Sequence, residues 1–275
     1  MVDVVEAITC AKCGAPLKVS PGESVILCTY CGSENNLRAD AKYIVSHSWM
    51  PNKLSKEDAI AKAREWMGGG LLMPPGMEKS EITKTDLVYI PLWAIEAKAK
   101  TQYAGLFQRG GEKRVEGNLD KSLFWKVLGR RDSKFPVREY KIPLSAKVPF
   151  TIEEAVRGEM LNGEIDEQEA KQVATTEIED YMQMVASEQV DKFEIIETNV
   201  EFGATEFVHI PIWVIDFAFG GKSYSLMVEG TNGEVIWGEI PASDFVSNDM
   251  KLVMAAAAVL VLVAAVALLV LAFIH

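Results

Sequence analysis

Groups that usually carry out catalysis are scarce in this sequence of 275 residues. It has four cysteines and three histidines, and no cysteine follows residue 31. It has no glycine-rich phosphate loop, because the glycines at 68–70 lead into a proline-containing linker. Carboxylates are numerous, but no pair stands out as a general acid and base. We therefore expect no enzymatic activity, with a hydrolase as an open alternative.

Positive charge is also in short supply, and it is unevenly distributed. The 28 Lys and Arg residues face 39 Asp and Glu residues, which gives a net charge of −11. Nucleic-acid binding rests on neutralising phosphates, so nucleic acid is not an expected partner of so acidic a chain. Residues 109–141 are the exception, with ten basic and five acidic residues, whereas residues 151–206 hold three basic and sixteen acidic residues.

The cysteines form two pairs, C-A-K-C-G at residues 10–14 and C-T-Y-C-G at residues 28–32. A two-residue gap lets a tight turn direct both sulfurs at one ion, and the following glycine permits a positive φ. Four thiolates form a closed tetrahedral site, which predicts one structural Zn²⁺. Iron in the same site is an alternative, whereas two disulfides would require an oxidising compartment. The predicted ligands are Cys10, Cys13, Cys28 and Cys31.

The sequence around these cysteines, C-x-x-C-G-A-P-L … V-I-L-C-x-Y-C-G, covers about residues 8–37. It resembles the zinc ribbons of the transcription-factor-B type and the rubredoxin-like ribbons that begin many other proteins. The resemblance implies a ribbon fold and a bound metal, but no transcriptional role.

Two later segments repeat one pattern, L-V-Y-I-P-L-W-A-I-E at residues 87–96 and F-V-H-I-P-I-W-V-I-D at residues 207–216. Their β-branched and aromatic content predicts strands. Trp93 and Trp213 are expected to pack into equivalent cores. The shared proline is expected at a sheet edge or a bulge, because it cannot donate to a ladder. His209, whose counterpart in the first copy is Tyr89, is expected to have an aromatic-type role in the core or at its rim.

Helix signals accompany both copies of this pattern. Residues 55–58 and 151–154 both have a hydroxyl three residues before a carboxylate, as in a capping box. Residues 164–186 have the spacing of a long, acidic amphipathic helix. We therefore predict a tandem duplication in which a helix is followed by an antiparallel hairpin. Residues 224–235 resemble the end of small helix-plus-hairpin modules of the PepSY type.

The basic stretch has a pattern of its own. Residues 121–131 place apolar residues at i, i+1, i+4 and i+5 among cations, which suits a short basic amphipathic helix. Such a helix would lie on anionic lipid headgroups or contact a partner. The alternatives are packing on the protein's own sheet and attraction to the acidic residues 151–206. The candidate contact residues are Lys121, Trp125, Lys126, Arg130 and Arg131.

Residues 252–274 are 23 consecutive apolar residues. As a helix they would span about 34 Å, enough to cross a hydrocarbon core of about 30 Å. The sequence therefore predicts a single C-terminal transmembrane helix. The first residues show no signal-peptide pattern. We expect a single-pass protein of the cell membrane with most of the chain in the cytoplasm.

These observations combine into one expectation, an α+β protein with a zinc ribbon, a duplicated helix-plus-antiparallel-hairpin body and a single C-terminal transmembrane helix. The whole arrangement resembles a family of prokaryotic (archaeal or bacterial) membrane-anchored zinc-ribbon proteins with repeated I-P-x-W strands. That resemblance implies recruitment of a protein partner, in some members a flotillin-like scaffold protein. The expected domains are 1–40 (ribbon), 41–145 (first repeat with the basic insertion), 146–241 (second repeat), 242–251 (linker) and 252–274 (transmembrane helix).

The expected function is that of a tail-anchored adaptor or scaffold. It would dock a protein partner at the cytoplasmic membrane surface, in contact with membrane lipid. The alternatives are a membrane-tethered nucleic-acid-binding or transcription regulator and an uncharacterised hydrolase.

Overall fold

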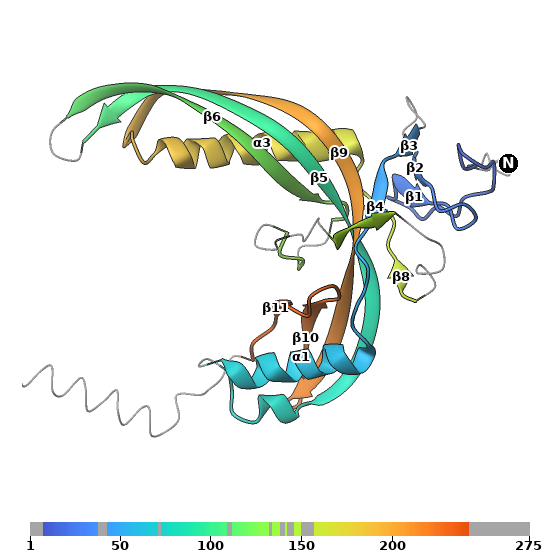
Figure 1. Ribbon diagram of the computed structural model, residues 1–275. Helices are drawn as coiled ribbons and strands as arrows, with labels where there is room; N and C mark the ends of the chain where they lie inside the picture. Colours follow the sequence, from blue (N-terminus) through green and yellow to red (C-terminus); the bar gives the residue numbers. More distant parts are fainter. Residues whose placement is uncertain are drawn as a thin grey trace, which may run out of the picture.

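Two very long strands organise this chain, β5 (Glu81–Phe107) and β9 (Lys192–Phe219). They pair antiparallel along almost their whole length in the computed structural model (Figure 1). At about 3.3 Å per residue, each strand has a contour length of about 90 Å. The described residues are 8–37, 43–70, 73–108, 112–131, 134–137, 141, 146–149 and 157–241.

Shorter strands extend this pair on both of its outer edges. β5 is joined by β6 (Lys113–Leu128) and β8 (Glu159–Met160), whereas β9 is joined by β4 (His47–Trp49) and β10 (Lys222–Glu229). β7 (Val148–Pro149) and β11 (Val235–Gly238) pair with β4 and β10. A separate three-stranded sheet near the N-terminus consists of β1 (Val25–Leu27), β2 (Glu34–Asn36) and β3 (Tyr43–Val45).

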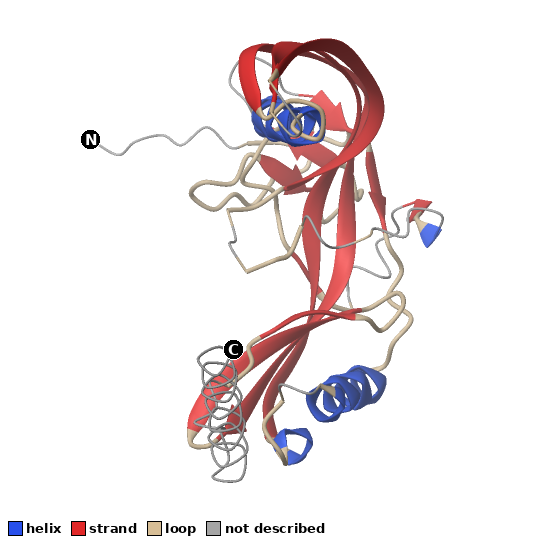
Figure 2. Ribbon diagram, turned by 90° about the vertical axis from the view of Figure 1, so that its left-hand side faces the viewer, coloured by secondary structure: helices blue, strands red, loops and turns tan. Residues whose placement is uncertain are grey.

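Two long helices, α1 (Lys56–Gly69) and α3 (Glu167–Ala186), cover different ends of the large sheet, and the short helix η1 (Met77–Lys79) follows α1. α1 contacts β9, β10 and β11, whereas α3 contacts β5, β6 and β9. Figure 2 shows the far end of the sheet curling around α3. α1 begins at the predicted capping box of Ser55 and Asp58. Asp166 caps the N-terminus of α3, and its carboxylate accepts two backbone N–H groups.

The two copies of the repeated pattern meet at the centre of the large sheet. Ile90 lies opposite Ile210, and Trp93 and Leu87 lie opposite Phe207 and Trp213. Ile90 and Ile210 occupy the same position in the two copies. The register therefore relates the copies by a local two-fold axis between these isoleucines.

The shared proline lies at the same place in each copy. Pro91 falls between the parts of β5 that pair with β8 and with β6, and Pro211 falls between the parts of β9 that pair with β4 and with β10. No strand needs an N–H donor there, so proline is tolerated. Each proline carbonyl accepts an N–H at 2.8 Å, from Gly129 and Gly230. Each proline therefore lies in a gap between two neighbouring strands, which confirms the expected edge position at that point of the sheet.

The two tryptophans connect each copy to the helix of the other. The Trp93 indole N–H donates to the carbonyl of Ile165 at 2.8 Å, just before α3. The Trp213 indole N–H donates to the side chain of Asn52 at 3.1 Å, just before α1. Both rings are buried in cores under the helices that they secure. The prediction of equivalent cores is confirmed, but each core combines parts of both copies.

The predicted fold class is wrong in its proportion of helix to strand and in the way the helices and strands are combined. Strand residues outnumber helical residues, so the fold is mainly β rather than α+β with separate helix-plus-hairpin units. A strand with a contour length of about 90 Å extends well beyond a 14-residue helix, which is about 21 Å long. Each long strand consequently passes under both helices. The second predicted capping box, at 151–154, lies outside the described residues.

The basic stretch 121–131 is not a helix, because most of it belongs to strand β6. Leu123, Trp125 and Val127 alternate toward the core under α3. This period of two is typical of a strand with one buried face.

The predicted transmembrane helix and the predicted location as a single-pass cell-membrane protein must also be corrected. Within the part of the chain that the structure describes, no helix has the length and apolar character needed to cross a bilayer. Residues 252–274, on which both predictions rest, lie outside the described residues. No membrane anchor enters the functional proposal.

Replacing either Trp93 or Trp213 by Phe tests whether each tryptophan secures the helix of the other copy. Each change removes one buried N–H donor and part of a ring, and should lower the free energy of unfolding by about 2 kcal/mol. Hydrogen–deuterium exchange should accelerate at the start of α3 in Trp93→Phe and at the start of α1 in Trp213→Phe. Each variant is the control for the other, and the reverse assignment would contradict the arrangement.

Candidate metal centre

The two cysteine pairs fold into closely similar turns. The Gly14 N–H donates to the Cys10 carbonyl at 2.9 Å, and the Gly32 N–H donates to the Cys28 carbonyl at 2.8 Å. Gly14 and Gly32 have φ values of 75° and 69°, which side chains with a Cβ rarely adopt. The predicted role of glycine after each pair is confirmed.

The four sulfurs face one another. Cys10 Sγ lies 3.7 Å from Cys31 Sγ, and Cys13 Sγ lies 3.7 Å from Cys28 Sγ. All four cysteines are free, and a disulfide would require about 2.05 Å between sulfurs. A tetrahedron with metal–sulfur bonds of about 2.3 Å has edges of about 3.8 Å. The four cysteines are therefore close enough to bind a metal ion such as zinc.

Hydrogen bonds shift the pKa values of the cysteines in this cluster in opposite directions. Burial raises the pKa of Cys10, but hydrogen bonds from Ser33 and the backbone outweigh it and lower the pKa to about 5. A hydrogen bond with the backbone of Ala15 lowers the pKa of Cys13, yet the neighbouring sulfurs outweigh it and raise the pKa to about 12. A cation among the sulfurs would favour four thiolates.

The cysteine-containing segment is attached firmly to the large sheet. Only Ser46 separates β3 from β4, so the chain passes directly from the small sheet into the large one. Gly163 donates its N–H to the Val25 carbonyl at 2.8 Å, and Val25 packs in the core under α3. A Cβ on Gly163 would come within 2.9 Å of the Phe207 ring, so this close approach requires glycine.

A second polar cluster lies at this junction, and it comprises Glu34 of β2, His47 of β4 and His209 of β9. His47 Nε2 lies 2.9 Å from His209 Nδ1, and each of these atoms lies 3.8 Å from Glu34 Oε1. Glu34 and His209 are fully buried. Neither carboxylate oxygen of Glu34 has a hydrogen-bond partner among the described residues. The other nitrogen of His209, Nε2, lies 2.8 Å from the Leu161 carbonyl and donates to it.

Burial dominates the titration of this cluster. It raises the pKa of Glu34 to about 8. Burial, together with the charge of His209, lowers the pKa of His47 to about 2, against a hydrogen bond with the Gly32 backbone. Burial also lowers the pKa of His209 to about 4, against the hydrogen bond to Leu161. Both imidazoles are therefore neutral at pH 7.

Sequence reasoning did not find this cluster. The histidines are scattered along the chain, and only the pairing of β4 with β9 brings His47 near His209. The sequence offered one signal: where the first copy of the repeated pattern has Tyr89, the second copy has a histidine.

The five predicted contact residues lie on β6 or just after it. Lys121 and Lys126 sit on β6 opposite Ala99 and Ala94 of β5. The other three contact acidic residues at 164–177: Trp125 donates to Glu177 at 2.8 Å, Arg130 pairs with Glu164 at 2.7 Å, and Arg131 pairs with Glu169 at 2.6 Å. This is the alternative in which the basic stretch attracts the acidic segment of the same chain.

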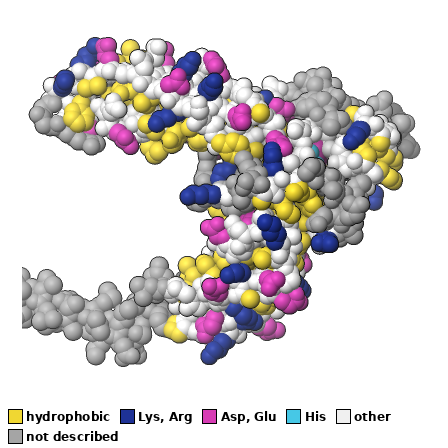
Figure 3. All heavy atoms as spheres, viewed as in Figure 1, with side chains coloured by type: hydrophobic (Ala, Val, Ile, Leu, Met, Phe, Trp, Pro, Cys, Tyr) yellow, Lys and Arg dark blue, Asp and Glu magenta, His cyan; other side chains and the backbone are white. Residues whose placement is uncertain are grey.

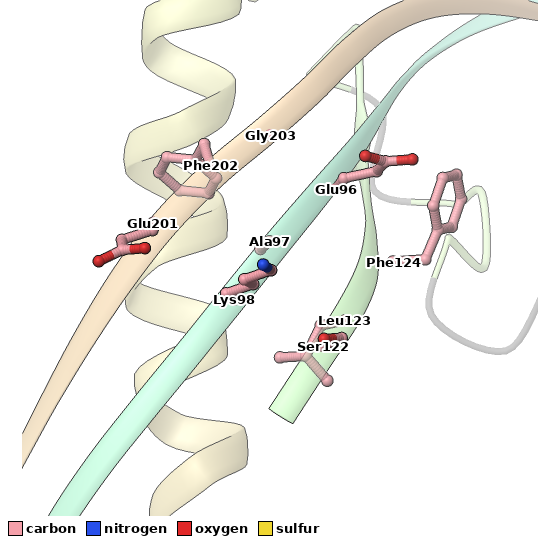
Figure 4. A pocket seen from close by; sticks show the side chains of 9 residues that line it. All are labelled: Glu96, Ala97, Lys98, Ser122, Leu123, Phe124, Glu201, Phe202 and Gly203. Carbon is pink, nitrogen blue, oxygen red and sulfur yellow. The ribbon is translucent and has the colours of Figure 1, made fainter. Parts of the chain in front are cut away.

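A shallow pocket of about 600 Å³ lies on the sheet, on the face opposite α3 (Figure 4). Carboxylates, one amine and the half-exposed ring of Phe124 line it, and its lining contains no imidazole or thiol. The side chains on this face include Glu96, Lys98, Ser122, Phe124 and Glu201.

Comparisons with protein-family models, characterised proteins and solved structures find no match to this chain. The site must therefore be interpreted from its own geometry.

Replacing Cys28 by Ser should remove one equivalent of thiolate-bound metal per chain, because three thiolates and a hydroxyl hold zinc far less tightly. In the wild-type protein, cobalt in this site should show thiolate-to-cobalt charge-transfer bands, which the variant loses. The apparent stability of residues 8–37 should fall with the metal. Ser20→Ala, a change at an exposed position of the same segment, is the control. Equal metal content in Cys28→Ser and wild type would contradict the site.

Proposed function

We propose that this chain is a non-enzymatic docking protein whose N-terminal segment is a zinc ribbon. The observation that carries the proposal is the exposed aromatic ring of Tyr30 between two of the cysteines. Its side chain is 66% exposed, whereas most large apolar side chains in the described part of the chain are buried.

The position of Tyr30 suits a docking role. It lies in the turn between Cys28 and Cys31, so the metal would hold both ends of that turn. A rigid turn loses little conformational entropy when it binds, and tyrosine is frequent among residues that dominate interface energies. The partner is a protein with an apolar pocket for this ring.

The metal in this proposal is structural. Four thiolates fill a tetrahedral zinc ion and leave no position for substrate or water. The ion stabilises a segment that has only three short strands and little core of its own. The attachment of this segment to the large sheet then gives the docking surface a fixed orientation.

Nucleic acid is less well supported as a partner. Arg130 and Arg131 of the basic stretch are ion-paired with carboxylates of the same chain. On the face seen in Figure 3, Lys and Arg side chains are interspersed with Asp and Glu rather than gathered into one basic area. A mixed surface of this kind neutralises few phosphates.

Site-specific photo-crosslinking in cells tests the proposal. A photoreactive residue at position 30 should capture one protein, and the same residue at the exposed position 57 of α1 should not. Tyr30→Ala should retain its metal and weaken binding of the recovered protein about thirtyfold, as expected for an interface residue that contributes about 2 kcal/mol. Cys28→Ser should also abolish capture. The same captured proteins at positions 30 and 57 would contradict the proposal.

A further inference from the structure

We propose that Glu34, His47 and His209 form a second metal site, which binds a divalent transition-metal ion such as Zn²⁺ at the junction between the two sheets. This inference does not rest on the docking function. It rests on the positions of three ligand atoms and on the chemistry around them.

The three atoms are spaced as ligands of one ion. His47 Nε2, His209 Nδ1 and Glu34 Oε1 form a triangle with sides of 2.9, 3.8 and 3.8 Å. The point equidistant from its corners is about 2.1 Å from each atom. Zinc bonds to histidine nitrogen and carboxylate oxygen have lengths of about 2.0–2.2 Å. An ion would fit here with little movement of the side chains.

The hydrogen bond at the far side of His209 supports the same role. Metal-bound histidines usually donate their other ring N–H to a carbonyl or a carboxylate. His209 Nε2 donates to the Leu161 carbonyl at 2.8 Å. This bond fixes the tautomer in which Nδ1 keeps its lone pair, and Nδ1 is the atom that faces Glu34 and His47.

The buried carboxyl group of Glu34 supports a cation more directly. Glu34 is fully buried, and both of its oxygens lack hydrogen bonds among the described residues. Burying a carboxyl group without partners is costly. The Phe207 ring, edge-on to His209 at 5.4 Å between centroids, makes the surroundings apolar and strengthens attraction to a cation. A divalent ion would supply the missing partner.

Two imidazole nitrogens and one carboxyl oxygen suit a transition metal better than Ca²⁺ or Mg²⁺, which prefer oxygen ligands. The ligands come from β2, β4 and β9, so the ion would fix the small sheet to the centre of the large one. Three protein ligands leave at least one coordination position for water.

Metal counting and spectroscopy on the full chain test this site. Wild-type protein should hold two ions per chain. Cobalt added after zinc has filled the cysteine site should give ligand-field bands without thiolate charge-transfer bands, because its ligands are nitrogen and oxygen. Detection of this cobalt without metal at the cysteines would support the second site and overturn the zinc ribbon.

Variants assign the ion to these residues. Glu34→Gln and His47→Gln should each weaken cobalt binding at least tenfold while thiolate-bound zinc is retained. Glu229→Gln is the matched control, since Glu229 is equally buried but its carboxylate accepts the backbone N–H of Asn232 at 2.7 Å. Equal binding by all these variants would overturn the proposal.

X-ray absorption at the zinc edge of wild-type protein decides the question without variants. Two sites predict both sulfur and nitrogen or oxygen neighbours in the zinc shell, in similar proportions. A shell of four sulfurs with one zinc per chain, after incubation with excess zinc, would overturn the second site even if Glu34→Gln fails to fold.

Discussion

The antiparallel ladder between β5 and β9 is the constraint on which the rest of the structure depends. The two strands pair from one end of the molecule to the other, with Ile90 opposite Ile210 at the centre. This register places the last part of each strand beside the first part of the other. A helix that covers one end therefore lies on strands of the other copy, so α1 contacts β9 and β10 and α3 contacts β5 and β6.

The ladder also explains where the two copies stop being equivalent. Tyr89 and His209 hold the same motif position on either side of the axis. Tyr89 packs against Trp49, with 5.4 Å between ring centroids. His209 faces His47 and Glu34, because β4, which directly follows the small sheet, pairs with β9 at this position. A nearly symmetric sheet thereby acquires one asymmetric, polar junction.

Local patterns predicted the local features well. The cysteine spacing identified the sulfur cluster, the I-P-x-W pattern identified the central strands, and the acidic periodicity identified α3, which begins three residues later than expected. These signals depend on neighbours a few residues apart. The exchange of helices between copies and the junction cluster depend on pairing between residues more than 100 positions apart, which no local pattern encodes. The prediction of a helix at 121–131 was wrong because its apolar residues fit both a helical and a strand spacing. Packing of one face under α3 favours the strand.

NMR measurement of cross-strand contacts between backbone protons of β5 and β9 tests the central claim most directly. The account predicts contacts centred on Ile90 and Ile210, with Trp93 beside Phe207 and Leu87 beside Trp213. Contacts centred elsewhere along the strands would contradict it. A register shifted by one residue would place the side chains of one strand on the opposite face of the sheet and would move the tryptophan of that strand out of its core.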